Sequence, residues 1–185
     1  MRHARRTRLL TPLLILPLLA APAVASAEDI EHSEHIQAEL IGYQEVPSVN
    51  TVASGEFRAT ISGDRQSIDY ELTFSGLQAP VTQSHIHVAQ LSVNGSVVIW
   101  LCQTTSAPAP ASVSALTPMC PQSGTITGII TAANVIAGSM ASQQLAAGHL
   151  ADVVAAIRAG VAYANVHTTV SAGGEIRGQI RASDH

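Results

Sequence analysis

The feature that most constrains the fold is a strict alternation of apolar and polar residues in two segments, 57–62 and 68–74. The apolar members fall two apart, at Phe57, Ala59 and Ile61 and then at Ile68, Tyr70, Leu72 and Phe74. Side chains of a β-strand point alternately to its two faces, so this period predicts two strands with one buried face each. Residues 62–65 (Ser-Gly-Asp-Arg) form a turn-type segment, which predicts a hairpin between them.

Short strand-like segments recur along the rest of the chain. We expect them at 36–42, around His85 and His87, and at 97–101, 124–131, 161–167 and 175–181, with Asn94-Gly95 as a hairpin turn. One helix is expected near 149–159, because apolar residues recur there at helical spacing before Gly160. These patterns predict a mostly β domain, an antiparallel β-sandwich or barrel with Greek-key-like connections and one short α-helix.

The N-terminus has the pattern of a secretory signal peptide. A basic start is followed by the apolar run 9–20 and by the small-residue site Ala25-Ser26-Ala27. We therefore expect a signal peptide at 1–27, a flexible acidic arm at 28–35, the β-domain at 36–181 and a tail at 182–185. The mature chain is predicted to be secreted, periplasmic or at the cell surface, with no membrane span; Arg5-Arg6 leaves Sec and twin-arginine export open.

The predicted mature chain is acidic and contains no lysine. Its five arginines and 13 acidic residues give a formal net charge of −8. This charge disfavours nucleic acid and anionic membranes as partners. The absence of lysine also excludes Schiff-base chemistry. The chain has no Gly-x-Ser-x-Gly motif of the kind that would indicate a hydrolase. We therefore expect a protein that is not an enzyme.

Cys102 and Cys120 are the two cysteines of the chain, and they flank a loop rich in Ser, Pro and Ala. In an exported chain such a pair favours a disulfide. A thiolate metal ligand is the alternative, although no histidine or other thiol lies at ligand spacing.

Three histidines are the candidate functional residues. His85 and His87 lie two apart, so they share one face of a strand, and His167 lies in a later predicted strand. Three imidazoles on β-strands can bind copper or zinc, with affinity expected to fall as the imidazoles protonate near pH 6. The same side chains can instead form hydrogen bonds in a polar core, and the residues alone leave both interpretations open.

Two further residues lie near the last histidine in sequence. Glu175 and Arg177 share one strand face, where they can support a ligand histidine from the second shell or form a salt bridge with each other, the latter being favoured. His149 is expected to be exposed beside the helix start. His32 and His35 are not expected to form a built site.

Several ordered motifs resemble the CHRD (chordin-type) domain. The resemblance covers about residues 36–181 and rests on Ala38-Glu39-Leu40-Ile41-Gly42, Glu45-Val46-Pro47, Ser54-Gly55, Gly76-Leu77, Ser84-His85-Ile86-His87, Val93-Asn94-Gly95, Asn165-Val166-His167-Thr168 and Gly174-Glu175-Ile176-Arg177-Gly178-Gln179-Ile180. The cysteine loop and the helix are similar to those of a bacterial and fungal branch. The resemblance implies a secreted or cell-surface β-module; the loops 88–92 and 169–172 depart from the family pattern.

A looser similarity links the histidines to the copper–zinc superoxide dismutase barrel. His85, His87 and His167 match its His-x-His strand and late-strand histidine, but the bridging histidine and the zinc-site aspartate have no counterpart. This similarity implies a mononuclear site. The leading hypothesis is an exported domain binding one copper or zinc ion; the alternatives are a metal-free module for an extracellular protein partner and a superoxide-related redox enzyme in which Arg177 steers the anion.

Overall fold

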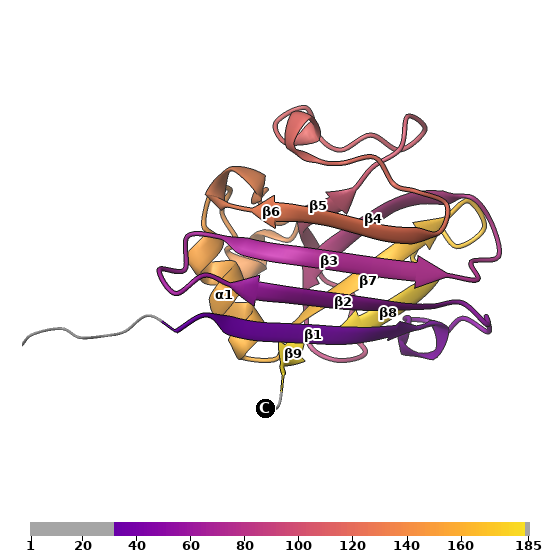
Figure 1. Ribbon diagram of the computed structural model, residues 1–185, viewed down its shortest axis with the longest axis horizontal. Helices are drawn as coiled ribbons and strands as arrows, with labels where there is room; N and C mark the ends of the chain where they lie inside the picture. The colour runs from indigo at the N-terminus through magenta and orange to yellow at the C-terminus, as the bar shows by residue number, and fades with distance from the viewer. Residues whose placement is uncertain (1–31, 184–185) are drawn as a thin grey trace, which may run out of the picture.

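The computed structural model describes residues 32–183, which form one antiparallel sheet curved almost into a barrel (Figure 1). The predicted signal peptide and residues 28–31 lie outside the described residues, as do 184–185. The strands are β1 Glu34–Ile41, β2 Ser54–Ile61, β3 Ile68–Ser75, β4 Val81–Val88, β5 Ser96–Cys102, β6 Gly124–Ile130, β7 Ala162–Thr168, β8 Ile176–Gln179 and β9 Arg181–Ala182. The predicted fold class is therefore confirmed.

The order of strands in the sheet is β5-β4-β7-β8-β1-β2-β3-β6, with β9 also paired to β1. One half of the barrel contains β5, β4, β7 and β8, and the other contains β1, β2, β3 and β6. The chain crosses between these halves after β3, after β5 and after β6. These crossings bring β4 beside β7, although about 80 residues of chain separate their paired residues. Strands that are distant in sequence can therefore build a common site.

The half made of β1, β2, β3 and β6 follows the predicted alternation. Phe57, Leu72 and their neighbours at two-residue spacing point into the core, while the residues between them face solvent. β2 and β3 pair along their whole length and form the predicted hairpin. Period-two patterning was sufficient here because solvent covers the outer face of these strands.

The half made of β4, β7 and β8 is buried on both faces. All seven residues of β7 and all four of β8 are buried. Their inner face is apolar and joins the core, through residues such as Ile86, Val166 and Ile176. The outer face is polar, so it must be covered by other parts of the chain.

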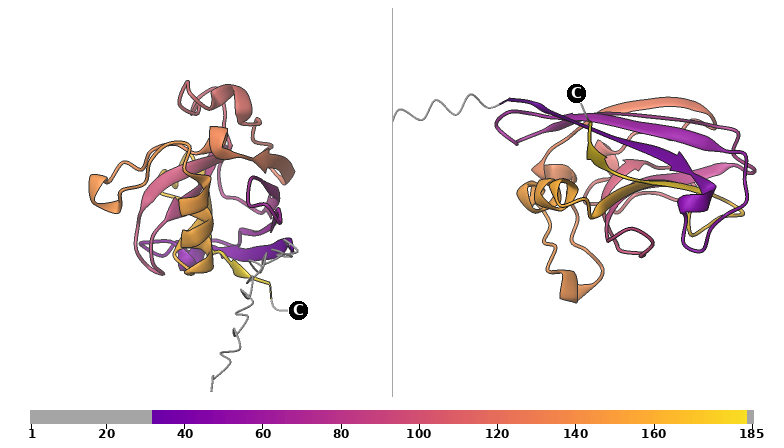
Figure 2. Two further views of the ribbon diagram at one scale, coloured as in Figure 1. Left: turned by 90° about the vertical axis from the view of Figure 1, so that its left-hand side faces the viewer. Right: turned by 90° about the horizontal axis from the view of Figure 1, so that it is seen from below.

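The helix α1, Leu150–Arg158, lies across one end of the barrel (Figure 2). Its buried residues include the predicted Leu150, Val153, Val154 and Ile157. Gly160 ends the helix with a positive φ of 69°, and Val161 N–H bonds Ala156 O while Gly160 N–H bonds Ile157 O, the pattern of a Schellman cap. None of the helices in residues 32–183 is long and apolar enough to cross a membrane.

The barrel has a seam between β5 and β6, the two ends of the strand order. The segment after β6 fills this seam through a bridge between Val135 and Ile99 and a bond from Ile136 N–H to Val98 O. A short 3₁₀ helix at Ala132–Asn134 starts this segment. The other 3₁₀ helices of the described residues are Gly42–Gln44, Ser114–Leu116 and Ala141–Gln143. A disulfide joins Cys102 to Cys120 and ties the irregular loop 103–123 to the end of β5.

Three sequence predictions about boundaries and turns were wrong. β1 begins at Glu34 rather than after residue 35, because Glu34 and His35 pair with Ile61 and Thr60. Ala182, assigned to the tail, pairs with β1 as part of β9. Asn94-Gly95 is not a tight two-residue turn: seven residues, 89–95, connect β4 to β5, and the turn in them is closed by Val93 N–H bonding Gln90 O.

Candidate metal centre

The strand register places a row of polar side chains on the outer face of β4, β7 and β8. Paired residues of antiparallel strands point to the same face. The pairs on this face are Gln83 with His167, His85 with Asn165, His87 with Tyr163, Asn165 with Arg177 and Tyr163 with Gln179. The loops 42–53, 89–95 and 169–174 contribute groups that touch these side chains, and the layer is thereby shielded from solvent.

His85, His87 and His167 meet within this layer. One ring nitrogen from each lies within 4.8 Å of those of the other two, and the three side chains form the one such group of potential ligands in residues 32–183. His85 Nδ1 lies 3.2 Å from His167 Nε2. The three residues are only 2%, 8% and 5% exposed, respectively. The structure thus brings together all three histidines that the sequence singled out.

Backbone carbonyls fix the orientation of two of the rings. His87 Nδ1 donates to Gly95 O at 2.9 Å, and His167 Nδ1 donates to Ala172 O at 2.9 Å. A carbonyl can only accept, so these bonds leave the lone pair of each ring on Nε2. Metal-bound histidines are held in this way, with the second nitrogen donating to a carbonyl or carboxylate.

The environment keeps the three imidazoles neutral. Burial lowers the pKa of His87 to about 4, with a smaller contribution of the same sign from the nearby charges of His167 and Arg177. Burial also lowers the pKa of His85 well below its usual value, and that of His167. The imidazoles therefore protonate at a lower pH than the value near 6 expected from the sequence. The neutral form, which binds metal, is present at neutral pH.

Next to the histidines is a stack of a cation and two rings. The guanidinium carbon of Arg177 lies 3.3 Å from the centre of the Tyr163 ring. The Tyr163 ring in turn is parallel to that of His87, with 4.6 Å between centres and 4° between planes. Arg177 is only 1% exposed, so its charge is held inside the protein and acts on the site with little screening.

A buried carboxyl, Glu45, interacts electrostatically with this charge. Burial raises its pKa to about 7, against the opposing charge of Arg177 and a smaller contribution from Asn165. Gly174 must lack a side chain here, because a Cβ at this position would collide with Glu45 Oε1. Glu45 is thus packed into the polar layer without belonging to the ligand group.

The predicted salt bridge between Glu175 and Arg177 is wrong, since no ion pair joins these two described residues. Glu175 precedes β8, and its carboxylate accepts bonds from Thr51 Oγ1, Thr168 Oγ1 and Gln78 N–H. Arg177 instead donates to Val93 O at 2.7 Å and to Asn94 Oδ1 at 3.2 Å. The two side chains therefore secure different loops, and Arg177 reaches the histidines through Tyr163.

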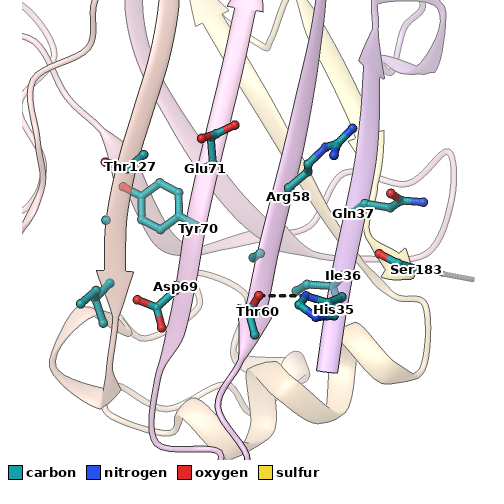
Figure 3. Close-up of a pocket in the computed structure, with 13 residues that line it drawn as sticks. His35, Ile36, Gln37, Arg58, Thr60, Asp69, Tyr70, Glu71, Thr127 and Ser183 are labelled. Carbon is teal, nitrogen blue, oxygen red and sulfur yellow. Dashed lines mark hydrogen bonds between the residues drawn. The ribbon is translucent and has the colours of Figure 1, made fainter. Parts of the chain in front are cut away.

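Other histidines lie apart from this centre. His149 is exposed before α1 and lies 3.2 Å from Asp152 Oδ2, in agreement with the expectation of an exposed position. His35 lies on the outer face of the other half of the barrel, where its Nδ1 is 3.0 Å from Thr60 Oγ1 (Figure 3). That face forms a shallow, open depression lined by polar and apolar residues of β1, β2, β3 and β6.

Sequence reasoning missed Tyr163, Asn165 and Glu45 as parts of the site. Tyr163 and Asn165 alternate with His167 along β7, so period two could have placed them on the same face. Glu45 belongs to the Glu45-Val46-Pro47 motif of the family resemblance, but no local pattern placed it at the site, because only the folding of the loop 42–53 over β8 brings it there.

Fold and site together define an antiparallel β-barrel module with a buried histidine cluster beneath its loops. The chain belongs to the CHRD domain family, whose profile matches residues 36–180. The CHRD domain is not a known enzyme family. No curated protein and no solved structure matches the chain.

Proposed function

We propose that this CHRD domain is an exported module that binds one copper or zinc ion through His85, His87 and His167. The donors would be Nδ1 of His85 and Nε2 of His87 and His167. Metal–nitrogen bonds of 2.0–2.1 Å require nitrogens about 3.3–3.6 Å apart. The 3.2 Å between His85 and His167, and the 4.8 Å limit for the group, are within small side-chain shifts of this value.

The observation that carries the proposal is the state of the ring nitrogens. Nε2 of His87, one of the proposed donors, is buried and has no hydrogen-bond partner among the described residues. A purely structural role would favour a partner for each buried nitrogen. The bond between His85 Nδ1 and His167 Nε2 requires a proton, because the lone pair of His167 is on Nε2, and a metal ion would take the place of that proton.

Export is part of the proposal for two reasons. The disulfide between Cys102 and Cys120 is typical of oxidising compartments. The leader at 1–27 has the three regions of a signal peptide.

The test is the metal content of the mature protein. We expect about one equivalent of copper or zinc by elemental analysis after purification from the native compartment. The double variant His85→Ala/His87→Ala should bind none, while His149→Ala, which alters an exposed histidine, should bind the same amount as wild type. Equal stoichiometry in the wild type and the double variant would overturn the proposal.

A second candidate is a metal-free module for an extracellular protein partner. The observation that favours it is the disulfide-tied loop 103–123, which presents the exposed side chains of Leu116 and Met119. An unchanged melting temperature of the metal-free protein on addition of copper or zinc would support this candidate.

The redox alternative loses its expected steering residue. Arg177 is buried and its guanidinium donates to the loop 89–95, so it offers no surface charge to attract superoxide. We expect the copper-loaded protein to consume superoxide no faster than free copper.

A further inference from the structure

The site contains three neutral donors, little access for a fourth ligand and a fixed positive charge nearby. From this combination we infer that it is built for copper(I), in three-coordinate form, in preference to copper(II) or zinc(II). The inference rests on the proposed function and names the ion and its oxidation state.

The number of donors is the first argument. No carboxylate or thiol of residues 32–183 joins the three histidines in the ligand group. Zinc takes four ligands in proteins, and where only three come from the chain a water or substrate completes the set. Copper(II) prefers a tetragonal arrangement with at least four donors. Copper(I) has a filled d shell and imposes no tetragonal geometry. Three imidazole nitrogens arranged in a plane around the ion are therefore sufficient to coordinate it.

Access to a fourth ligand is the second argument. His85 and His87 have ring nitrogens that solvent does not reach. Trp100 packs against His85 in an edge-to-face arrangement, with 4.2 Å between ring centres and 76° between ring planes. On the other side, Tyr163 lies flat against His87. Water would have to displace packed aromatic rings to reach the ion.

The charge around the site is the third argument. Arg177 carries a buried positive charge one ring away from His87, because its guanidinium lies over the Tyr163 ring, which is stacked on His87. A second positive charge in a poorly solvated site adds an unfavourable interaction that grows with the charge of the ion. Glu45 offsets it only in part, because burial raises its pKa to about 7. Three neutral ligands supply no compensating negative charge, so a monovalent ion is favoured over a divalent one.

The experiment compares three ions on the same metal-free mature protein. Copper(I) affinity is measured without oxygen against a bathocuproine chelator, zinc(II) affinity with a colorimetric zinc indicator, and the copper(II)/copper(I) preference by the midpoint potential of bound copper. We expect copper(I) to displace zinc and to bind at least about 100-fold more tightly than copper(II). That ratio raises the potential by about 120 mV over aqueous copper. X-ray absorption should show three nitrogen neighbours.

Two variants of the charged neighbours sharpen the test. Arg177→Gln should reduce the preference for copper(I) about tenfold, whereas Arg177→Lys, which keeps the charge, should restore it. Glu45→Gln removes the negative charge that partly offsets Arg177, so it should increase the preference for copper(I). This second variant keeps the test decisive if Arg177→Gln does not fold. Thermal unfolding verifies each variant.

Each outcome has a separate meaning. If the folded protein binds none of the three ions at one equivalent, the proposed function itself fails. If zinc or copper(II) binds as tightly as copper(I), or if bound copper(II) shows a stable tetragonal spectrum, the site is metal-binding but the inference about copper(I) is overturned.

Discussion

The two halves of the barrel use the outer faces of their strands in different ways. On β2 and β3, outward side chains such as Arg58 and Glu71 face solvent over the shallow depression of Figure 3. On β4, β7 and β8 the outward side chains are equally polar but lie beneath loops. The first arrangement needs only hydrophobic patterning, whereas the second needs a partner for each buried polar atom. Nε2 of His87 is one of the buried atoms of this layer that lack a partner, and it lies at the proposed metal site.

Truncating a core side chain should lower the free energy of unfolding by a similar amount in both halves. This is the largest effect that we expect. Phe57→Ala in the solvent-covered half should lower the free energy of unfolding by about 3–5 kcal/mol, and Ile86→Ala beneath the histidines by about 2–5 kcal/mol, because both leave a cavity in one shared core. Chemical denaturation measures both. A much smaller loss for Ile86→Ala would mean that the two halves do not share a core.

Replacing a glutamate should change the free energy of unfolding by different amounts in the two halves. Glu175→Ala should cost about 1.5–3 kcal/mol, because it leaves donors from Thr51, Thr168 and Gln78 without their acceptor. Glu71→Ala, on the solvent-covered half, should change the free energy of unfolding by less than about 0.5 kcal/mol. Equal costs for the two substitutions would contradict the comparison.

Acid should destabilise the metal-free protein through the polar layer, with a smaller effect than the core substitutions. The folded pKa of His87, about 4, lies below its usual 6.5, so the unfolded chain takes up the proton first. The free energy of unfolding should therefore fall as pH drops from about 6.5 towards 4, and the lowered pKa values of His85 and His167 act in the same direction.

Glu45 acts with the opposite sign. Its pKa rises from 4.5 to about 7 on folding, so its stabilising contribution is present below pH 4.5 and is lost as pH rises through 7. Glu45→Gln should remove this decline, so the loss of stability between about pH 6.5 and 4.5 should be steeper in the variant than in the wild type. Denaturation curves of both proteins between pH 4 and 8 measure this, and the same pH dependence in the wild type and the variant would refute the assignment of Glu45.

The sequence was sufficient for the features that depend on local periodicity. The alternation in 57–62 and 68–74, the spacing of Leu150 to Ile157 and the shared face of His85 and His87 each follow from strand or helix geometry. The meeting with His167 needed long-range pairing, which only the family resemblance implied. Glu45, the separate partners of Glu175 and Arg177, and the seven-residue β4–β5 loop depend on how loops pack over the sheet, for which no local pattern exists.

The carbonyls that orient the histidines lie close to them along the chain. Gly95 O belongs to the loop after His87, and Ala172 O to the loop after His167. Surface loops usually accept insertions and deletions readily. Here a change of even one residue in either loop would shift the carbonyl and release the ring that it holds. The connections that would ordinarily be freest to vary in length are therefore expected to be among the most restricted in this chain.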